Sequence, residues 1–119
     1  MGTTSFTQLN VWKKAHEVAL AVYKATQKYP SEERFGLCSQ MRNAAVSIAS
    51  NIAEGYGRRS PRDKARFYNI SEGSAEELKY HLILSRDLGY LSDLDSLYRP
   101  LEDVSRMLRS LTDSTLRPS

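Results

Sequence analysis

The chain has 119 residues, of which 40% are hydrophobic and 26% are charged, a composition that favours one globular domain and argues against a disordered chain. Cys38 is the only cysteine, so no disulfide can form within the chain, and we expect a reducing, cytoplasmic location. Charged residues interrupt every apolar stretch, which argues against a signal peptide and a membrane span. The net charge of +3 permits contact with a polyanion without requiring it.

The first helical pattern extends from about residue 7 to residue 28. Apolar or small residues recur there at steps of three and four, which places them on one side of a helix. Pro30 follows, and because a proline disfavours the helical conformation in the residue before it, we expect the helix to end near Tyr29. The predicted core-facing residues are Leu9, Trp12, Ala15, Ala19, Val22 and Thr26.

The second pattern extends from about residue 37 to residue 56 and is unusually rich in alanine and serine. Because these side chains are small, a neighbouring helix can approach closely and a second face can pack as well as the first. We expect Gly55 and Gly57 to cap the end of this helix, since glycine readily adopts the left-handed conformation. The predicted core-facing residues are Leu37, Met41, Ala44, Ala45, Ile48 and Ile52.

The third pattern extends from about residue 61 to residue 88. Ser60 followed by Pro61 is a strong helix start, with the serine as N-cap, and Gly89 is expected to cap the other end. Gly73 costs about 1 kcal/mol relative to alanine inside a helix, which predicts a close backbone crossing at that position. The predicted core-facing residues are Phe67, Ile70, Ser74, Leu78, Leu82 and Ser85.

The fourth pattern extends from about residue 93 to residue 112, and we expect a frayed tail over residues 113–119. Pro100 removes a backbone hydrogen bond, so it should kink this helix or divide it into a short turn and a main helix from Leu101. The predicted core-facing residues are Leu94, Leu97, Tyr98, Leu101, Val104, Leu108 and Leu111.

These four patterns predict an all-α protein. The connections between the patterns are short, which favours antiparallel neighbours. We therefore expect residues 1–119 to form one domain, an antiparallel up-down four-helix bundle with a kinked fourth helix.

No set of residues indicates catalysis, a metal site or a cofactor site. Glu77 and His81 can meet on one helix face, and we expect a solvated pair at the bundle surface. His16 is expected at the boundary of an apolar stripe, and Cys38 as a buried small residue rather than a nucleophile. The sequence therefore predicts a protein that is not an enzyme and uses no cofactor.

Positive charge is concentrated between residues 58 and 66. In one interpretation these cations only complement helix ends and solvate a turn, but a helix dipole disfavours cations near the start of the third helix. In the other they bind nucleic-acid phosphates, with Tyr56 or Tyr68 stacking nearby. The five candidate phosphate-binding residues, which have only Asp63 among them as an anion, are Arg58, Arg59, Arg62, Lys64 and Arg66.

Two longer runs indicate a family. RNAAVSIASNIAEGYGR and the later RFYNISEGSAEELKYHLILSRDLGYL closely resemble the four-helix-bundle proteins encoded in intervening sequences of bacterial 23S ribosomal RNA genes. The same family includes the accessory variability proteins of diversity-generating retroelements. The resemblance extends from about residue 9 to residue 111. Ala49 departs from it, because many relatives carry proline there, so the kink expected at that proline can be absent.

The resemblance implies an assembly and a set of partners. The protomers are expected to form a homopentameric ring or barrel with a basic surface for nucleic acid, and the retroelement members also bind a reverse transcriptase. By position, Asn51, Glu54 and Gly55 lie in the signature segment of the family, and Arg58 and Arg59 follow it. The signature is either functional or a packing motif in which Asn51 and Glu54 bond across helices or protomers.

Two functions therefore remain open. In the first, the protein is an oligomeric accessory factor, with a pentamer favoured, that binds RNA or DNA. In the second, it is a self-assembling scaffold for another protein, such as a reverse transcriptase, with weak or no contact to nucleic acid. Neither function involves a membrane.

Overall fold

Four long helices account for most of the chain in the computed structural model, which describes residues 5–118. They are α1 (Asn10–Thr26), α2 (Leu37–Gly57), α3 (Pro61–Asp87) and α4 (Asp95–Leu116). Two short 3-10 helices, η1 (Phe6–Gln8) and η2 (Ser31–Glu33), precede α1 and α2. Residues 5–118 contain no strand, so the all-α prediction is confirmed.

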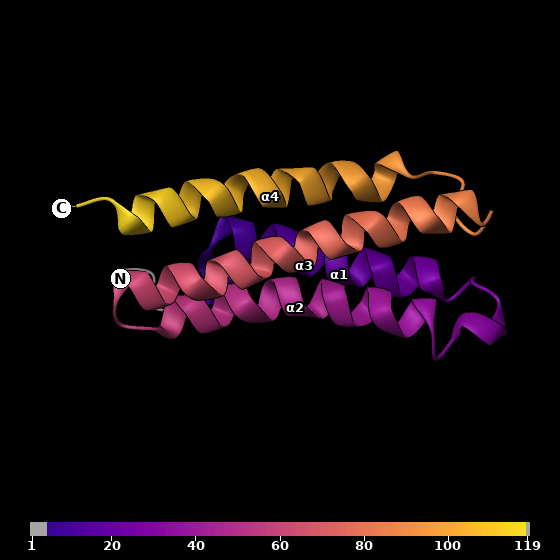
Figure 1. The fold of residues 1–119 in the computed structure, drawn as a ribbon, viewed down its shortest axis with the longest axis horizontal. Helices are drawn as coiled ribbons and strands as arrows, with labels where there is room; N and C mark the ends of the chain where they lie inside the picture. The colour runs from indigo at the N-terminus through magenta and orange to yellow at the C-terminus, as the bar shows by residue number, and fades with distance from the viewer. Residues whose placement is uncertain (1–4, 119) are drawn as a thin grey trace.

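The helices lie side by side along the long axis of a body of 49 × 22 × 21 Å, and successive helices run in opposite directions (Figure 1). Helix α2 packs against α1 and α3, and α4 packs against α3 and α1, which completes a four-helix bundle. The turn between α2 and α3 lies at the same end of the bundle as the end of α4 (Figure 1). The connection between α3 and α4 lies at the opposite end.

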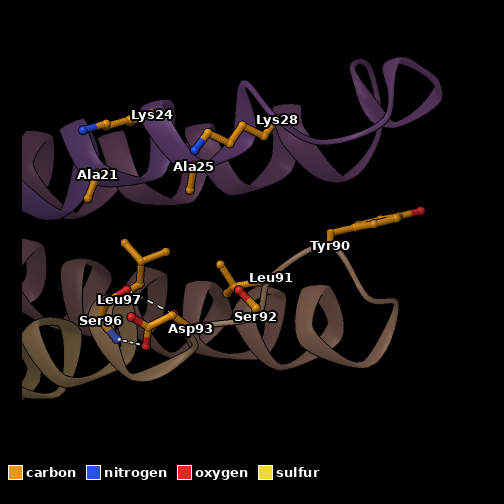
Figure 2. A pocket seen from close by; sticks show the side chains of 10 residues that line it. All are labelled: Ala21, Lys24, Ala25, Lys28, Tyr90, Leu91, Ser92, Asp93, Ser96 and Leu97. Carbon is orange, nitrogen blue, oxygen red and sulfur yellow. Dashed lines mark hydrogen bonds between the residues drawn. The ribbon is translucent and has the colours of Figure 1, made fainter.

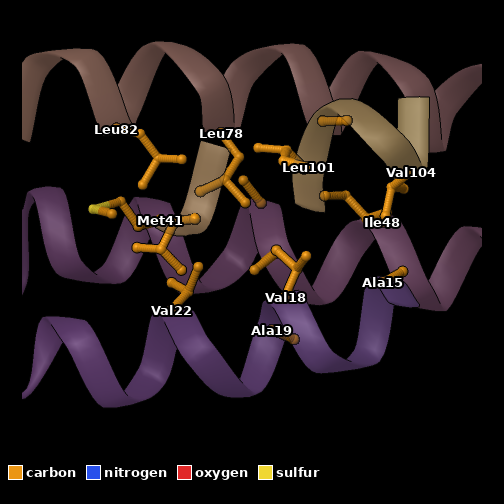
Figure 3. Packing of buried hydrophobic residues seen from close by; sticks show 14 of the residues in the cluster. Ala15, Val18, Ala19, Val22, Met41, Ile48, Leu78, Leu82, Leu101 and Val104 are labelled. Carbon is orange, nitrogen blue, oxygen red and sulfur yellow. The ribbon is translucent and has the colours of Figure 1, made fainter. Parts of the chain in front are cut away.

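The core lies along the bundle axis and receives residues from all four helices (Figure 3). The predicted stripe of the second helix is confirmed, since all six of its residues are buried. In the first helix the buried stripe also includes Val11 and Val18, whereas Leu9 and Trp12 are only partly buried. In the fourth helix Leu97, Leu101, Val104 and Leu108 are buried as predicted.

The predicted stripe of the third helix is wrong in its first half. Tyr68, Ser71 and Ala75 are buried there, whereas Ile70 is 43% exposed. The buried residues lie one position later because Tyr68 packs over Gly55 of α2 and the Ser71 hydroxyl donates a hydrogen bond to the Ile48 carbonyl. From Leu78 to Ser85 the prediction and the structure agree.

Two of the predicted helix caps are confirmed and two are wrong. The Ser60 hydroxyl accepts a hydrogen bond of 3.1 Å from the Asp63 backbone N–H, and Gly89 adopts a left-handed φ of +84° after α3. Gly55 and Gly57 do not have positive φ values; both lie within α2, which ends at an extended Arg58. Gly55 serves instead for close packing.

Two further expectations differ from the structure. The surroundings of Gly73 are open, because a Cβ atom at that position would meet nothing within 4 Å, so the predicted close crossing is wrong. Helix α4 continues without a break through Pro100, so it is not divided at Leu101, and the kink stays a prediction. The expected frayed tail is helical as far as Leu116, because Thr112 is buried and Thr115 donates a hydrogen bond to the Leu111 carbonyl; residue 119 lies outside the described residues.

None of the helices in the described part of the chain is long and apolar enough to cross a membrane.

Candidate nucleic-acid interface

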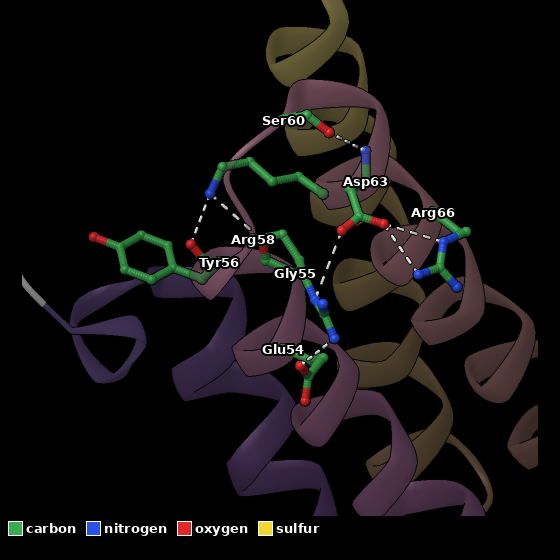
Figure 4. Close-up of polar contacts among 8 residues, drawn as sticks. Glu54, Gly55, Tyr56, Arg58, Ser60, Asp63 and Arg66 are labelled. Carbon is green, nitrogen blue, oxygen red and sulfur yellow. Dashed lines mark hydrogen bonds and ion pairs between the residues drawn. The ribbon is translucent and has the colours of Figure 1, made fainter.

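The five predicted phosphate-binding residues lie at one end of the bundle, around the turn from α2 to α3 (Figure 4). This turn is short because α2 ends at Gly57 and Ser60 already caps α3. The structure brings these residues to one end, but their side chains differ in how many partners they have within the protein.

Arg58 is bound on two sides. Its guanidinium lies 2.8 Å from a Glu54 carboxylate oxygen and 3.8 Å from an Asp63 oxygen (Figure 4). It also lies over the ring of Phe67, 4.6 Å from the ring centre. Arg58 therefore links the end of α2 to the start of α3.

Lys64 and Arg66 also have structural partners. The Lys64 ammonium donates hydrogen bonds to the Tyr56 carbonyl at 2.6 Å and the Gly55 carbonyl at 3.4 Å, so it compensates the negative end of α2. Arg66 pairs with Asp63 at 3.0 Å (Figure 4). These contacts explain two of the three cations near the start of α3 that the dipole disfavours.

Arg59 and Arg62 remain. Both are exposed, and neither forms a hydrogen bond or ion pair within residues 5–118. Their guanidinium groups are therefore available to an external anion, and of the five predicted residues they fit a phosphate contact best.

Arg117 lies at the same end and was not among the predicted residues. It follows directly after α4, is exposed, and makes no ion pair with any described residue. It is separated from the basic turn by 51 or more positions of sequence, so only the fold brings them to one end. No local pattern could have identified it.

Positive charge exceeds negative charge around the α2–α3 turn and the end of α4, a region that we call the basic end. Six cations and three anions lie in it, an excess of three positive charges. The charged residues of the basic end are Arg58, Arg59, Arg62, Lys64, Arg66 and Arg117, with Glu54, Asp63 and Asp113.

Each of the three signature residues has contacts within the chain. The Asn51 amide donates hydrogen bonds to the Ser47 carbonyl and hydroxyl at 2.9 and 3.0 Å, and the Ser47 hydroxyl is 2.8 Å from that of Ser74 on α3. Glu54 pairs with Arg58. A side chain at Gly55 would place its Cβ atom 2.6 Å from the Tyr68 ring, so glycine permits the close approach of α2 and α3.

The two tyrosines proposed for base stacking are not equivalent. Tyr68 is 2% exposed, and burial raises the pKa of its hydroxyl, so its ring cannot stack on a base. Tyr56 is half-buried, with the Lys64 ammonium 5.3 Å from its ring centre.

The remaining candidates lie elsewhere in the bundle. His81 is buried rather than solvated, so the predicted surface pair is wrong; its Nε2 atom lies 3.6 Å from the Glu77 carboxylate, and burial lowers the pKa of its imidazole while Glu77 opposes this shift. His16 is exposed and stacks on Trp12. Cys38 is buried as predicted, and burial raises the pKa of its thiol. No cluster of metal-ligating side chains occurs in the described ranges.

Two comparisons with known proteins found similarity to this chain. A family model described as 23S rRNA-intervening sequence protein matches residues 7–110. The chain is also similar to the crystal structure of a protein with unknown function from the S23 ribosomal protein family of Bacteroides thetaiotaomicron, with a TM-score of 0.80 and 24% identity over 87% of this chain and 95% of that chain. No curated protein matches the sequence. The structural similarity supports the four-helix fold.

Proposed function

We propose that this chain, which belongs to the 23S rRNA-intervening sequence protein family, is a non-enzymatic, oligomeric accessory protein whose basic end contacts nucleic-acid phosphates. The observation that carries the proposal is the excess of positive charge at the basic end, where the Arg59 and Arg62 guanidinium groups have no partner within the described chain. Contacts to phosphates carry no base information, so binding through this charge should be insensitive to sequence. Assembly of several copies would multiply this charge and steer a polyanion toward it.

Oligomerisation is supported by a second surface, a groove between α1 and α2. Every residue that lines it is uncharged, and Val46 is 44% exposed. The stacked rings of Trp12 and His16 border it on α1, and small side chains of α2 form its floor. An uncharged groove of this kind favours burial against a second copy. The lining residues are Phe6, Trp12, His16, Ala19, Val46, Ala49, Ser50 and Ala53.

The experiment is a salt titration of nucleic-acid binding by the R59Q/R62Q variant, measured by fluorescence anisotropy with a labelled single strand and a labelled duplex. Each lost phosphate contact should reduce the slope of log affinity against log salt by about 0.9 for duplex DNA and about 0.7 for a single strand. The loss should be similar for unrelated sequences, because phosphate contacts carry no base information. Arg58 is left unchanged because its ion pairs join α2 to α3.

The matched control is R34Q/R99Q, which removes two exposed cations that lack ion pairs in the described chain and lie toward the opposite end of the bundle, after η2 and near the start of α4. Circular dichroism and sedimentation of both variants must match the parent. If R59Q/R62Q then keeps the affinity and the salt slope of the parent, the phosphate-binding proposal is wrong.

The second candidate is a scaffold for another protein, such as a reverse transcriptase. It is favoured by the uncharged groove and by the internal partners of Arg58, Lys64 and Arg66, which leave fewer cations available than the sequence suggests. This candidate would be favoured if the parent protein forms an oligomer but does not bind nucleic acid. A gene position beside a reverse transcriptase rather than inside a ribosomal RNA gene would support it further.

A further inference from the structure

A cleft of about 440 Å³ opens between the second half of α1 and the segment that connects α3 to α4 (Figure 2). The segment between α3 and α4 that borders it lies at the end of the bundle opposite the basic end (Figure 1). The apolar part of the cleft comes from two alanines of α1, Ala21 and Ala25, and from Leu91 and Leu97 on the facing side. The cleft is open because the α1 side chains are small. Its volume and apolar lining suit a small ligand.

Two lysines lie on the α1 side of this cleft. Lys24 and Lys28 are exposed, and neither ammonium forms a hydrogen bond or ion pair within the part of the chain that the structure describes. The carboxylate on the facing side belongs to Asp93, which accepts a hydrogen bond of 3.3 Å from the Ser96 backbone N–H at the start of α4 (Figure 2). The cleft therefore has two lysine ammonium groups without ion pairs beside an apolar surface, and Asp93 is the one acidic residue in its lining.

Helix energetics account for only part of this arrangement. The negative end of α1 favours Lys24 in its last turn and Lys28 in the turn after Thr26, but neighbouring like charges repel each other. Neither effect explains why an apolar hollow lies beside the two charges. A ligand with an anionic group and an apolar body would satisfy both features.

We propose that the cleft binds a phosphate monoester, with the phosphate held by Lys24 and Lys28 and the apolar body of the ligand against Ala25, Leu91 and Leu97. A phosphate dianion matches the two ammonium charges, and lysine ammonium groups are common phosphate ligands. The ester could be a lipid-like alkyl phosphate or a nucleoside monophosphate, whose base could lie against the half-buried ring of Tyr90.

The test is isothermal titration calorimetry of the full chain with hexyl phosphate, adenosine monophosphate and inorganic phosphate. Hexyl phosphate or the nucleotide should bind more tightly than inorganic phosphate, and whichever of the two binds more tightly identifies the source. The K24Q/K28Q variant should weaken that binding about tenfold or more, because two charge-assisted contacts are lost. Ala25→Leu should weaken it while both charges remain, because leucine fills the cleft.

The matched control is K13Q/R99Q, which removes two exposed cations that do not line the cleft and should bind as the parent does. Both lysines are exposed, so K24Q/K28Q should keep the parent's circular dichroism spectrum even if Ala25→Leu perturbs packing. The proposal is wrong if neither ester binds at millimolar concentration, if K24Q/K28Q binds as tightly as the parent, or if inorganic phosphate binds as tightly as the esters.

Discussion

Two glycines in the long helices have opposite surroundings, and they make a matched pair for measuring the packing of α2 against α3. A Cβ atom at Gly55 would lie 2.6 Å from the buried Tyr68 ring and 3.1 Å from the Lys64 carbonyl, whereas a Cβ atom at Gly73 would meet nothing within 4 Å. Gly55→Ala should therefore destabilise the protein by about 1–3 kcal/mol, although alanine is the better helix former. Urea unfolding at fixed protein concentration measures the change.

Gly73→Ala is the control, and it should stabilise the protein by about 0.5–1 kcal/mol because only the helix propensity changes. Equal effects of the two substitutions would contradict a packing role for Gly55.

His81 should make stability depend on pH. Because burial lowers the pKa of its imidazole in the folded state, the unfolded chain takes up a proton first as the pH falls below about 6.5. The stability contributed by neutral His81 is complete above that pH and decreases as the pH falls toward the lowered folded value. The carboxylate of Asp103, whose pKa is lowered mainly by its hydrogen bond with Arg106, affects stability only in a more acidic range.

Unfolding free energies between pH 7.5 and pH 5 should therefore fall less steeply in His81→Gln than in the parent. An unchanged slope in His81→Gln would show that His81 is not the group responsible.

At the scale of the helices, sequence patterns were most informative where one residue type dominates a face. The second helix was predicted correctly because large apolar residues at four of its buried positions mark the core-facing side among alanines and serines. The buried face of the first half of α3 was predicted wrongly. It includes Ala65, Ser71 and Ala75, and a hydrophobic pattern does not distinguish such small residues from surface residues. That register depends on Gly55 and Ile48 of α2, and a single-helix pattern contains no information about a partner helix.

The start of α3 is set by one side-chain hydrogen bond, from the Asp63 backbone N–H to the Ser60 hydroxyl. Ser60→Ala should cost about 1 kcal/mol of stability, the usual effect of losing an N-cap. Ser110→Ala, at an exposed position within α4, is the control and should be neutral or slightly stabilising. Thermal or urea unfolding distinguishes the two, and equal stabilities would argue against a capping role for Ser60.

At the scale of the whole molecule, the candidate interface could be predicted only as a charged segment. The sequence identified the cations of residues 58–66, but their pairing with Glu54, Asp63 and the carbonyls of α2 depends on how the turn folds. The contribution of Arg117 depends on the direction in which α4 returns. Because of the fold, fewer cations of residues 58–66 are available to an external anion than the sequence suggests, and Arg117 joins them from a distant position in the chain.

Assembly is the remaining prediction at this scale, and the groove between α1 and α2 gives it a specific test. The chain mass is 13.5 kDa, so a pentamer, which the family resemblance favours, would sediment at about 67 kDa. Val46→Glu places a charge in the uncharged groove, and because burying an unpaired carboxylate is costly, assembly through this surface should be lost and the 13.5 kDa species should appear. Leu116→Glu is the control, since Leu116 is similarly exposed at the end of α4 and does not line the groove. If the parent protein sediments at 13.5 kDa at micromolar concentration, the proposal that it is an oligomer is wrong. If the Val46→Glu variant still assembles, the interface between copies lies on another face of the bundle.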